Sequence, residues 1–199
     1  KAIKLDNQSL EIKRKLKDQM GIASSLYYLA GIERTKGIYK EAIKLNNRSL
    51  RILRKLGDLR GIASSLHGLA DVYFSQGDYE KAIELYNQSV EIKRKLGDQS
   101  GVDHSVRHLA IIEQEKGNYE EAIKLYNKCL EIEKKLGAQR EVALSYRSLG
   151  LIYERLSNLT TAADYLSRAL DIFQEIGDKH NATIAKTDYE RVTKQKTAT

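Results

Sequence analysis

Proline and tryptophan are absent from this chain of 199 residues, and cysteine and methionine occur once each. The single cysteine, Cys129, excludes an internal disulfide and makes a reducing compartment, which we take to be the cytoplasm, the expected setting. No apolar run approaches the length that a membrane-spanning helix needs. Linkers and low-complexity segments are missing too, because the glycines fall almost only at periodic positions.

Motifs that carry catalysis are also missing. No glycine-rich loop could cradle phosphates, and no G-x-S-x-G sequence marks a nucleophile. Most acidic residues fall at helix positions that we expect to face solvent. We therefore predict no enzymatic activity, no catalytic residue and no cofactor for this chain.

What the sequence does have is a repeat of 40 residues, clearest in the stretch 61–96, GIASSLHGLADVYFSQGDYEKAIELYNQSVEIKRKL. Each unit contains two segments with apolar residues at helical spacing, joined by two or three residues. A period of this size indicates a solenoid built from one supersecondary unit. The period is marked by Gly37, Gly77 and Gly117, by Gly57, Gly97, Gly137 and Gly177, and by Ala2, Ala42, Ala82, Ala122 and Ala162.

The repeat predicts an all-α fold of antiparallel helix hairpins in one domain, 1–199. The first helices of the units are expected at 19–36, 59–76, 99–116 and 139–156, and the second at 1–16, 39–56, 79–96, 119–136 and 159–176. A last helix at about 179–194 is expected as a polar cap, with frayed residues 195–199. The domain then consists of a half repeat, four full repeats and a cap: 1–17, 18–57, 58–97, 98–137, 138–177 and 178–199. Because Lys1 falls within a repeat, we expect a fragment of a longer protein.

Glycine and short polar residues mark the predicted helix ends. Gly57 and its equivalents can adopt the left-handed conformation that ends a helix. Asp58 and its equivalents can cap the next helix, and Asn118 with Glu121 has the pattern of a capping box. Ser157 replaces the turn glycine in the fourth full repeat.

A consensus runs through the repeats in the order large hydrophobic, small, aromatic, glycine, aromatic, alanine, aromatic and small. In the second full repeat these residues are Leu69, Ala70, Tyr73, Gly77, Tyr79, Ala82, Tyr86 and Ser89. The pattern resembles the tetratricopeptide repeat (TPR) over essentially the whole chain, which implies a right-handed superhelix. The unit is longer than the usual TPR of about 34 residues and is similar to the long repeats of Pins-type adaptors and kinesin light chains.

The chain departs from this family where relatives hold their ligands. Pins-type adaptors usually have asparagine just after the Leu-Gly pair, whereas this chain has Gly31, Asp71, Ile111 and Leu151 there. Tyr27 and Gly31 also stand where chaperone-binding TPR domains need lysine and asparagine. Neither class of partner is therefore carried over to this chain.

In the TPR arrangement the first helices of the repeats line a concave groove. Aromatic and basic residues, the usual anchors of interfaces, are spaced to project into it. We predict a groove that binds a peptide or helical segment of a partner protein, with acidic residues in that segment. The predicted groove residues are Tyr27, Tyr28, Arg34, His67, Asp71, Phe74, His104, Arg107, His108, Arg147 and Arg155.

Other interpretations of the surface stay open. The groove could be merely solvated, with the partner on the convex face or at an end, and exposed repeat ends would allow self-association. The net charge of +7 permits nucleic acid, and basic runs such as 93–95 end the second helices, although cations there also favour the helix dipole. A ligand-sensing region of a larger protein is a further alternative. His104 and His108 have metal-compatible spacing, but nothing fixes further ligands, so no metal site is predicted.

Overall fold

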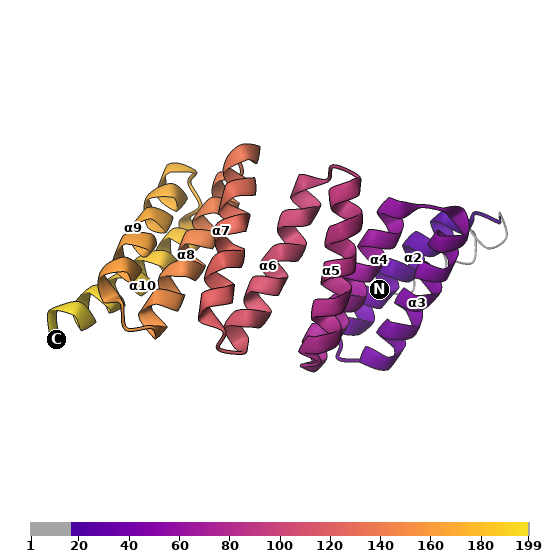
Figure 1. Cartoon of the computed structure of the whole chain (residues 1–199), viewed down its shortest axis with the longest axis horizontal. Coiled ribbons are helices and arrows are strands. Elements are labelled where there is room, and N and C mark those ends of the chain that lie inside the picture. Colours follow the sequence, from indigo (N-terminus) through magenta and orange to yellow (C-terminus); the bar gives the residue numbers. More distant parts are fainter. Residues whose placement is uncertain (1–16, 199) are drawn as a thin grey trace. The chain divides into compact units, whose positions relative to one another are not determined.

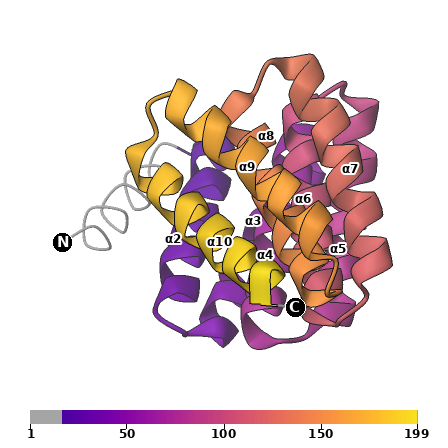
Figure 2. The same cartoon turned by 90° about the vertical axis from the view of Figure 1, so that its left-hand side faces the viewer.

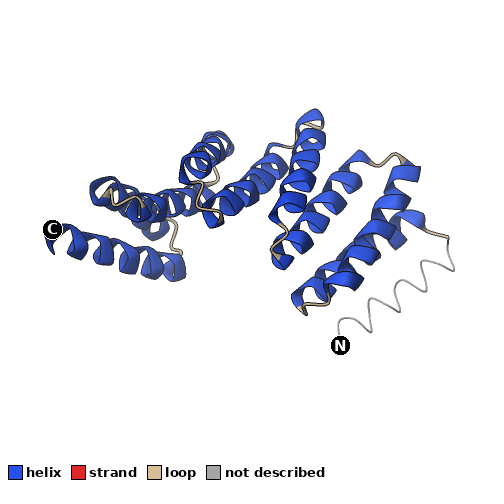
Figure 3. Ribbon diagram, turned by 60° about the horizontal axis from the view of Figure 1, so that its bottom comes forward, coloured by secondary structure: helices blue, strands red, loops and turns tan. Residues whose placement is uncertain are grey.

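The computed structural model describes residues 17–198, so the first predicted helix, 1–16, lies outside the described residues. The described residues form nine α-helices and no strand (Figure 1, Figure 3). Their bounds are α2 Gln19–Thr35, α3 Tyr39–Leu56, α4 Leu59–Gln76, α5 Tyr79–Lys95, α6 Gln99–Glu115, α7 Tyr119–Leu136, α8 Gln139–Arg155, α9 Leu159–Glu175 and α10 Lys179–Ala198. The predicted all-α fold is confirmed, and α2 to α9 begin and end within one residue of the predicted positions.

The chain forms two compact units that divide within α6, between Ser105 and Val106. The first unit holds α2 to α5 and the N-terminal half of α6. The second holds the C-terminal half of α6 and α7 to α10. The single domain 1–199, its repeat boundaries and the right-handed superhelix stay predictions.

The first unit is a stack of helix hairpins in which α2 packs on α3, α3 on α4 and α4 on α5. A serine of each second helix ties the hairpin together. Ser49 Oγ donates to the carbonyl of Ala23, and Ser89 Oγ donates to the carbonyl of Ala63, both at 2.8 Å. Both serines are fully buried, so the bond offsets the free-energy cost of burying their hydroxyls.

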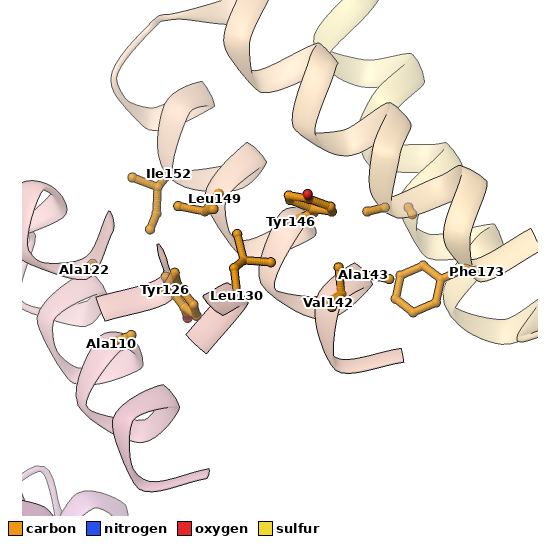
Figure 4. Close-up of a cluster of buried hydrophobic side chains, with 12 residues drawn as sticks. Ala110, Ala122, Tyr126, Leu130, Val142, Ala143, Tyr146, Leu149, Ile152 and Phe173 are labelled. Carbon is orange, nitrogen blue, oxygen red and sulfur yellow. The ribbon is translucent and has the colours of Figure 1, made fainter. Parts of the chain in front are cut away.

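The second unit has a continuous apolar core that both helices of each hairpin share. Tyr126 of α7, Leu149 of α8 and Phe173 of α9 belong to one cluster of buried side chains (Figure 4). Figure 2 shows α9 and α10 side by side, and α8 packs against α9 as well. α10, for which a capping role stays a prediction, packs on α9 and contributes Ala185 to this core.

Small residues lie where the two helices of a repeat cross, as the repeat pattern predicts. Ala30, Ala70 and Ala110 have no exposed surface. The fourth full repeat has Gly150 at this position, and a Cβ added there would lie 2.7 Å from Leu166 Cγ. The close approach of α8 and α9 therefore requires a residue without a side chain.

The helix ends follow the predicted chemistry with one exception. Gly57 ends α3 in the left-handed region with φ 69°, and Ser157 takes the same conformation with φ 59°. Asp58 Oδ1 caps α4 by accepting from a backbone N–H at 3.1 Å. The predicted capping box at Asn118 is wrong, because the Asn118 side chain accepts no bond from α7. Its Nδ2 instead donates to Glu113 Oε2 at 2.6 Å, a hydrogen bond strengthened by the charge of the carboxylate.

The C-terminal helix continues further than predicted. α10 runs to Ala198, so the expectation that 195–198 fray is wrong. Val192, in the fourth turn of this helix, is fully buried in a cluster with Ala162 and Leu166 of α9. The apolar packing of α10 therefore reaches Val192, and the helix continues beyond it through mostly exposed residues.

One residue of the predicted basic edge is not at the surface. Lys93 is buried, and its Nζ donates to Ser105 Oγ at 2.9 Å. Burial lowers the pKa of the Lys93 ammonium. The basic run 93–95 is therefore exposed only after its first residue.

Among the helices of residues 17–198, none combines the length and the apolar character that crossing a membrane requires.

Candidate functional site

The first unit contains a cavity of about 270 Å³ between α2, α3 and α4. Tyr27, Tyr28 and Arg34 of α2 and Asp71 of α4 line it, so the structure brings together four of the predicted groove residues. Tyr28 is 64% exposed and meets the Tyr27 ring edge-on, with 5.6 Å between the ring centroids. One space therefore offers aromatic, cationic and anionic contacts. The remaining lining residues are Gly31, Asn46 and Gly68.

Glycines in the middle of two helices shape this cavity. Gly31 and Gly68 lie inside the continuous helices α2 and α4, where each costs about 1 kcal/mol of stability relative to alanine. A Cβ at Gly68 would lie 2.8 Å from Tyr27 Cε2 and 3.3 Å from Asn46 Oδ1, so glycine lets the Tyr27 ring lie against α4. A Cβ at Gly31 would have no atom within 4 Å, which means that this position faces open space.

Asn46 of α3 is a site residue that the sequence analysis missed. It stands at the position that Tyr86 and Tyr126 occupy in the next two repeats, so a short amide replaces a phenol. Asn46 is 2% exposed, and its Oδ1 has no hydrogen-bond partner within residues 17–198. The departure from the aromatic consensus was a visible signal in the sequence that could have identified it.

The second repeat shows what a tyrosine does at this position. Tyr86 is fully buried, its ring packs edge-on against His67 at 5.1 Å, and its hydroxyl donates to Asp71 Oδ1 at 2.5 Å. Burial, with the Asp71 carboxylate nearby, raises the pKa of Tyr86, so the phenol stays protonated and remains the donor. The other carboxylate oxygen of Asp71, Oδ2, makes no hydrogen bond in the part of the chain that the structure describes.

Arg34 is the cation of the cavity. Its Nη1 donates to Ser75 Oγ at 3.3 Å, and the guanidinium forms no ion pair with any described residue. A guanidinium has five N–H donors, so Arg34 retains donors for a ligand. Burial, and then the nearby Asp71, raise the pKa of Tyr27, whose hydroxyl also stays a donor.

A second depression, of about 180 Å³, lies toward the N-terminal ends of α2 and α4. Its lining includes Ser24 and Ser64, two more positions that project from the first helices, and Met20, which is 45% exposed. Tyr27 and Tyr28 border this depression as well as the cavity. An elongated ligand lying across α2 and α4 would therefore contact both tyrosines along its length.

Three other predicted groove residues of the first unit do not line the cavity. His67 is buried, its Nδ1 lies 3.0 Å from Ser105 Oγ, and its Nε2 lies 3.5 Å from Asp71 Oδ1. Phe74 is half-buried, and its ring lies 5.9 Å from that of a tyrosine in α5. His104 is exposed on α6, with 4.7 Å between its ring centroid and that of His67. His67 therefore packs beside Asp71 on the interior side of α4 and does not line the cavity.

In the second unit, two of the predicted groove arginines are paired within the chain. Arg107 of α6 forms an ion pair with Glu133 of α7 and donates to Ser145 Oγ of α8 at 3.0 Å. Arg147 of α8 donates to Asp188 Oδ2 of α10 at 2.7 Å. These pairs, which helical spacing alone does not predict, neutralise cations that were expected to attract an acidic ligand.

The pair of Arg147 belongs to a larger network at α10. Arg191 donates to Asp188 at 3.0 Å and makes two bonds to the Glu154 carboxylate, at 2.9 and 2.7 Å. These bonds lower the pKa of Glu154. Arg155 is exposed and forms no ion pair with a described residue, and His108 is partly buried on α6. Arg155 is thus the predicted arginine of this unit whose charge is not neutralised.

Known proteins with this architecture are similar to the chain mainly in fold. A sequence model described as Tetratricopeptide repeat matches residues 21–95 and 103–184, and it indicates no catalytic family. No curated protein sequence matches the chain. BtubC (BKLC) from P. vanneervenii has a TM-score of 0.76 and 20% identity over 99% of this chain and 91% of that one.

Two further structures bear on the repeat type. A putative kinesin light chain from Podosopora anserina with TPR-like repeats has a TM-score of 0.71 and 22% identity, over 86% of this chain and 85% of that one. A Rap protein complexed with Competence and Sporulation Factor has a TM-score of 0.68 and 17% identity, over 96% of this chain and 57% of that one. The resemblance to long kinesin-light-chain repeats is confirmed, and since the family model covers more than half of the residues, the chain belongs to the tetratricopeptide repeat family.

Proposed function

We propose that the chain is a protein-interaction module that binds a peptide or helical segment of a partner protein across α2 and α4, without chemistry. The observation that carries the proposal is the cavity of about 270 Å³ at which Tyr27, Tyr28, Arg34 and Asp71 meet. Repeats of this family generally mediate protein–protein interaction, and the Rap protein of the same fold is complexed with a factor. Aromatic and arginine side chains are frequent hot spots of such interfaces.

The bound segment is expected to carry an acidic residue opposite Arg34. Arg34 and Arg155 are the predicted arginines that form no ion pair within residues 17–198, whereas Arg107 and Arg147 are already paired. A carboxylate can bind a guanidinium through two parallel hydrogen bonds, which adds orientation as well as affinity. The single cysteine, Cys129, is buried and forms no disulfide, which suits a reducing compartment, so we place this interaction in the cytoplasm.

Selection from a random peptide library on the immobilised chain, followed by fluorescence anisotropy of each selected peptide, tests the proposal. Tyr28→Ala and Arg34→Glu are each expected to weaken binding about tenfold or more, as truncation of a hot spot does. Arg51→Glu is the matched control, because Arg51 is exposed on α3 away from the cavity lining and undergoes the same charge reversal. It should leave the affinity unchanged.

Peptides that bind both cavity variants as tightly as the unaltered chain would place the site on another surface. Circular dichroism verifies that each variant keeps its helices. A chain that selects no peptide but binds nucleic acid with steep salt dependence would favour the basic edge of the second helices instead.

A further inference from the structure

Successive repeats differ at the cavity in a coordinated way. In the second repeat Tyr86 donates to Asp71, and in the third Tyr126 donates to a glutamine of α6 at 3.3 Å. The first repeat has Asn46 in place of the tyrosine and Gly31 at the position of Asp71. Both changes remove side-chain volume, and both residues line the same cavity. The first repeat therefore lacks the internal tyrosine and the side chain that would face it.

The vacated space is lined as an aromatic side chain requires. Tyr86 packs edge-on against His67, and in the first repeat Tyr27 stands at the position of His67. Aromatic rings favour edge-on or offset contacts with one another. With a volume of about 270 Å³, the cavity holds a single side chain rather than a whole turn of helix.

The charges of the lining discriminate between the side chains that could enter. A lysine or arginine inside the cavity would face the Arg34 guanidinium, and an aspartate or glutamate that reached past Arg34 would face the Asp71 carboxylate. The acidic residue expected opposite Arg34 therefore stays at the mouth of the cavity. A phenol is neutral and opposed by neither charge. Its single O–H donor also matches Asp71 Oδ2, which has no hydrogen bond among the described residues, while its oxygen can accept from Arg34.

We infer that the cavity of the first unit binds a tyrosine side chain of the partner segment, with the ring against Tyr27 and the hydroxyl donating to Asp71. The Asp71 carboxylate then accepts hydrogen bonds from two phenol hydroxyls, that of Tyr86 and that of the ligand tyrosine. The inference rests on the proposed function and specifies one residue that the bound segment carries.

The test begins with N-acetyl-tyrosinamide as the probe and a chain labelled with ¹⁵N. Its titration is expected to shift the amide signals of Gly31 and Gly68 and the side-chain NH₂ of Asn46. N-acetyl-phenylalaninamide lacks the hydroxyl and should bind about tenfold more weakly, since a hydrogen bond to a carboxylate is lost. Equal binding of the two probes, stronger binding of N-acetyl-argininamide, or no shifts with the tyrosine probe at its solubility limit each overturns the inference.

A double variant, Gly31→Asp with Asn46→Tyr, installs in the first repeat the pair that the second repeat already forms. It should fold, unfold at a higher temperature because the cavity is filled, and no longer bind the tyrosine probe. Asn47→Tyr makes the same substitution one residue along α3 at an exposed position, and it should leave binding of the probe unchanged. A folded double variant that still binds the probe would show that the cavity is not the site.

Asp71→Asn supplies an independent measurement that does not depend on filling the cavity. The neutral amide keeps the volume and offers a weaker acceptor, so the preference for the tyrosine probe over the phenylalanine probe should fall toward one. An unchanged preference overturns the role given to Asp71. If library-selected peptides lose affinity in Tyr28→Ala yet bind equally well with their tyrosines replaced by alanine, the proposed function stands and this inference fails.

Discussion

The ion pair of Arg107 with Glu133 allows the energetics of the second unit to be tested closely. The Glu133 side chain is 1% exposed and that of Arg107 is 16% exposed. Ser145 Oγ links them, since it donates to Glu133 Oε1 and accepts from Arg107 Nη1, each at 3.0 Å. Removing one partner of a buried pair costs about 3–5 kcal/mol, because the remaining charge keeps its desolvation penalty. Arg107 reaches solvent, so we expect the lower end of this range.

The chain itself provides an apolar version of this site. The positions equivalent to Glu133 and Arg107 in the first full repeat are Leu53, which is buried, and Tyr27. Glu133→Leu alone should therefore lower the free energy of unfolding by about 3 kcal/mol. Adding Arg107→Tyr should restore it to within about 1 kcal/mol, since well-packed apolar residues often replace a buried ion pair at no cost.

Urea unfolding followed by far-ultraviolet circular dichroism measures all four members of this cycle. A nearest-neighbour analysis of the transitions is required, because stacked repeats need not unfold in one step. The expected coupling between the two substitutions is about 2 kcal/mol or more, well above the additivity error of distant sites. The reasoning is refuted if Glu133→Leu is as stable as the unaltered chain, or if the double variant merely sums the two single effects.

Three further predictions concern local geometry. Gly150→Ala should destabilise the second unit by about 1–3 kcal/mol through overpacking. Gly31→Ala, whose added Cβ would have no atom within 4 Å, should instead stabilise the first unit by about 0.5–1 kcal/mol. Thermal unfolding in which both variants shift the midpoint in the same direction would contradict this. Ser157→Gly should stabilise the protein by about 0.5–1 kcal/mol and so raise the unfolding temperature, because Ser157 has φ 59°, a conformation that strains residues other than glycine. A lower unfolding temperature would show that the serine is not strained. Hydrogen bonds from the side chain and backbone N–H of Asn181 lower the pKa of Asp178 to about 2, so its stabilising contribution, present above its unfolded pKa of about 3.9, should be lost as the pH falls through 2. Asp178→Asn should flatten this acid dependence, and a carboxyl ¹³C titration midpoint near 4 would exclude the bond.

The helices were predictable from sequence because the same spacing of apolar residues and glycines recurs in every repeat. Left-handed glycines such as Gly57 and caps such as Asp58 depend on neighbouring residues alone, so their chemistry could be inferred directly. The cap at Asn118 failed because Glu113, at the end of the preceding helix, competes for its amide. That competition depends on how the turn folds back, which spacing along one helix does not reveal.

The candidate site was predictable only where it depended on a single helix face. Tyr27, Tyr28 and Arg34 share a face of α2, and helical spacing sufficed to bring them together. The pairing of Arg147 with Asp188 joins residues 41 positions apart on different helices, so it follows from the register between helices. Asn46 was not identified from its own position, because the loss of an aromatic ring opens a cavity only when Gly31 and Gly68 also leave the space of that ring unfilled.

Repeats this similar pose a problem of order during folding, since each hairpin could stack on the wrong neighbour with little loss of apolar contact. One buried position on the second helices differs in every full repeat: Leu53, Lys93, Glu133 and Phe173. Glu133 does not distinguish one neighbour from another, because its counter-charge Arg107 belongs to the same hairpin and stays beside it in any stack. The order of the hairpins depends instead on contacts between successive repeats, such as the bond from Arg147 to Asp188, because no other repeat has a carboxylate at the position of Asp188.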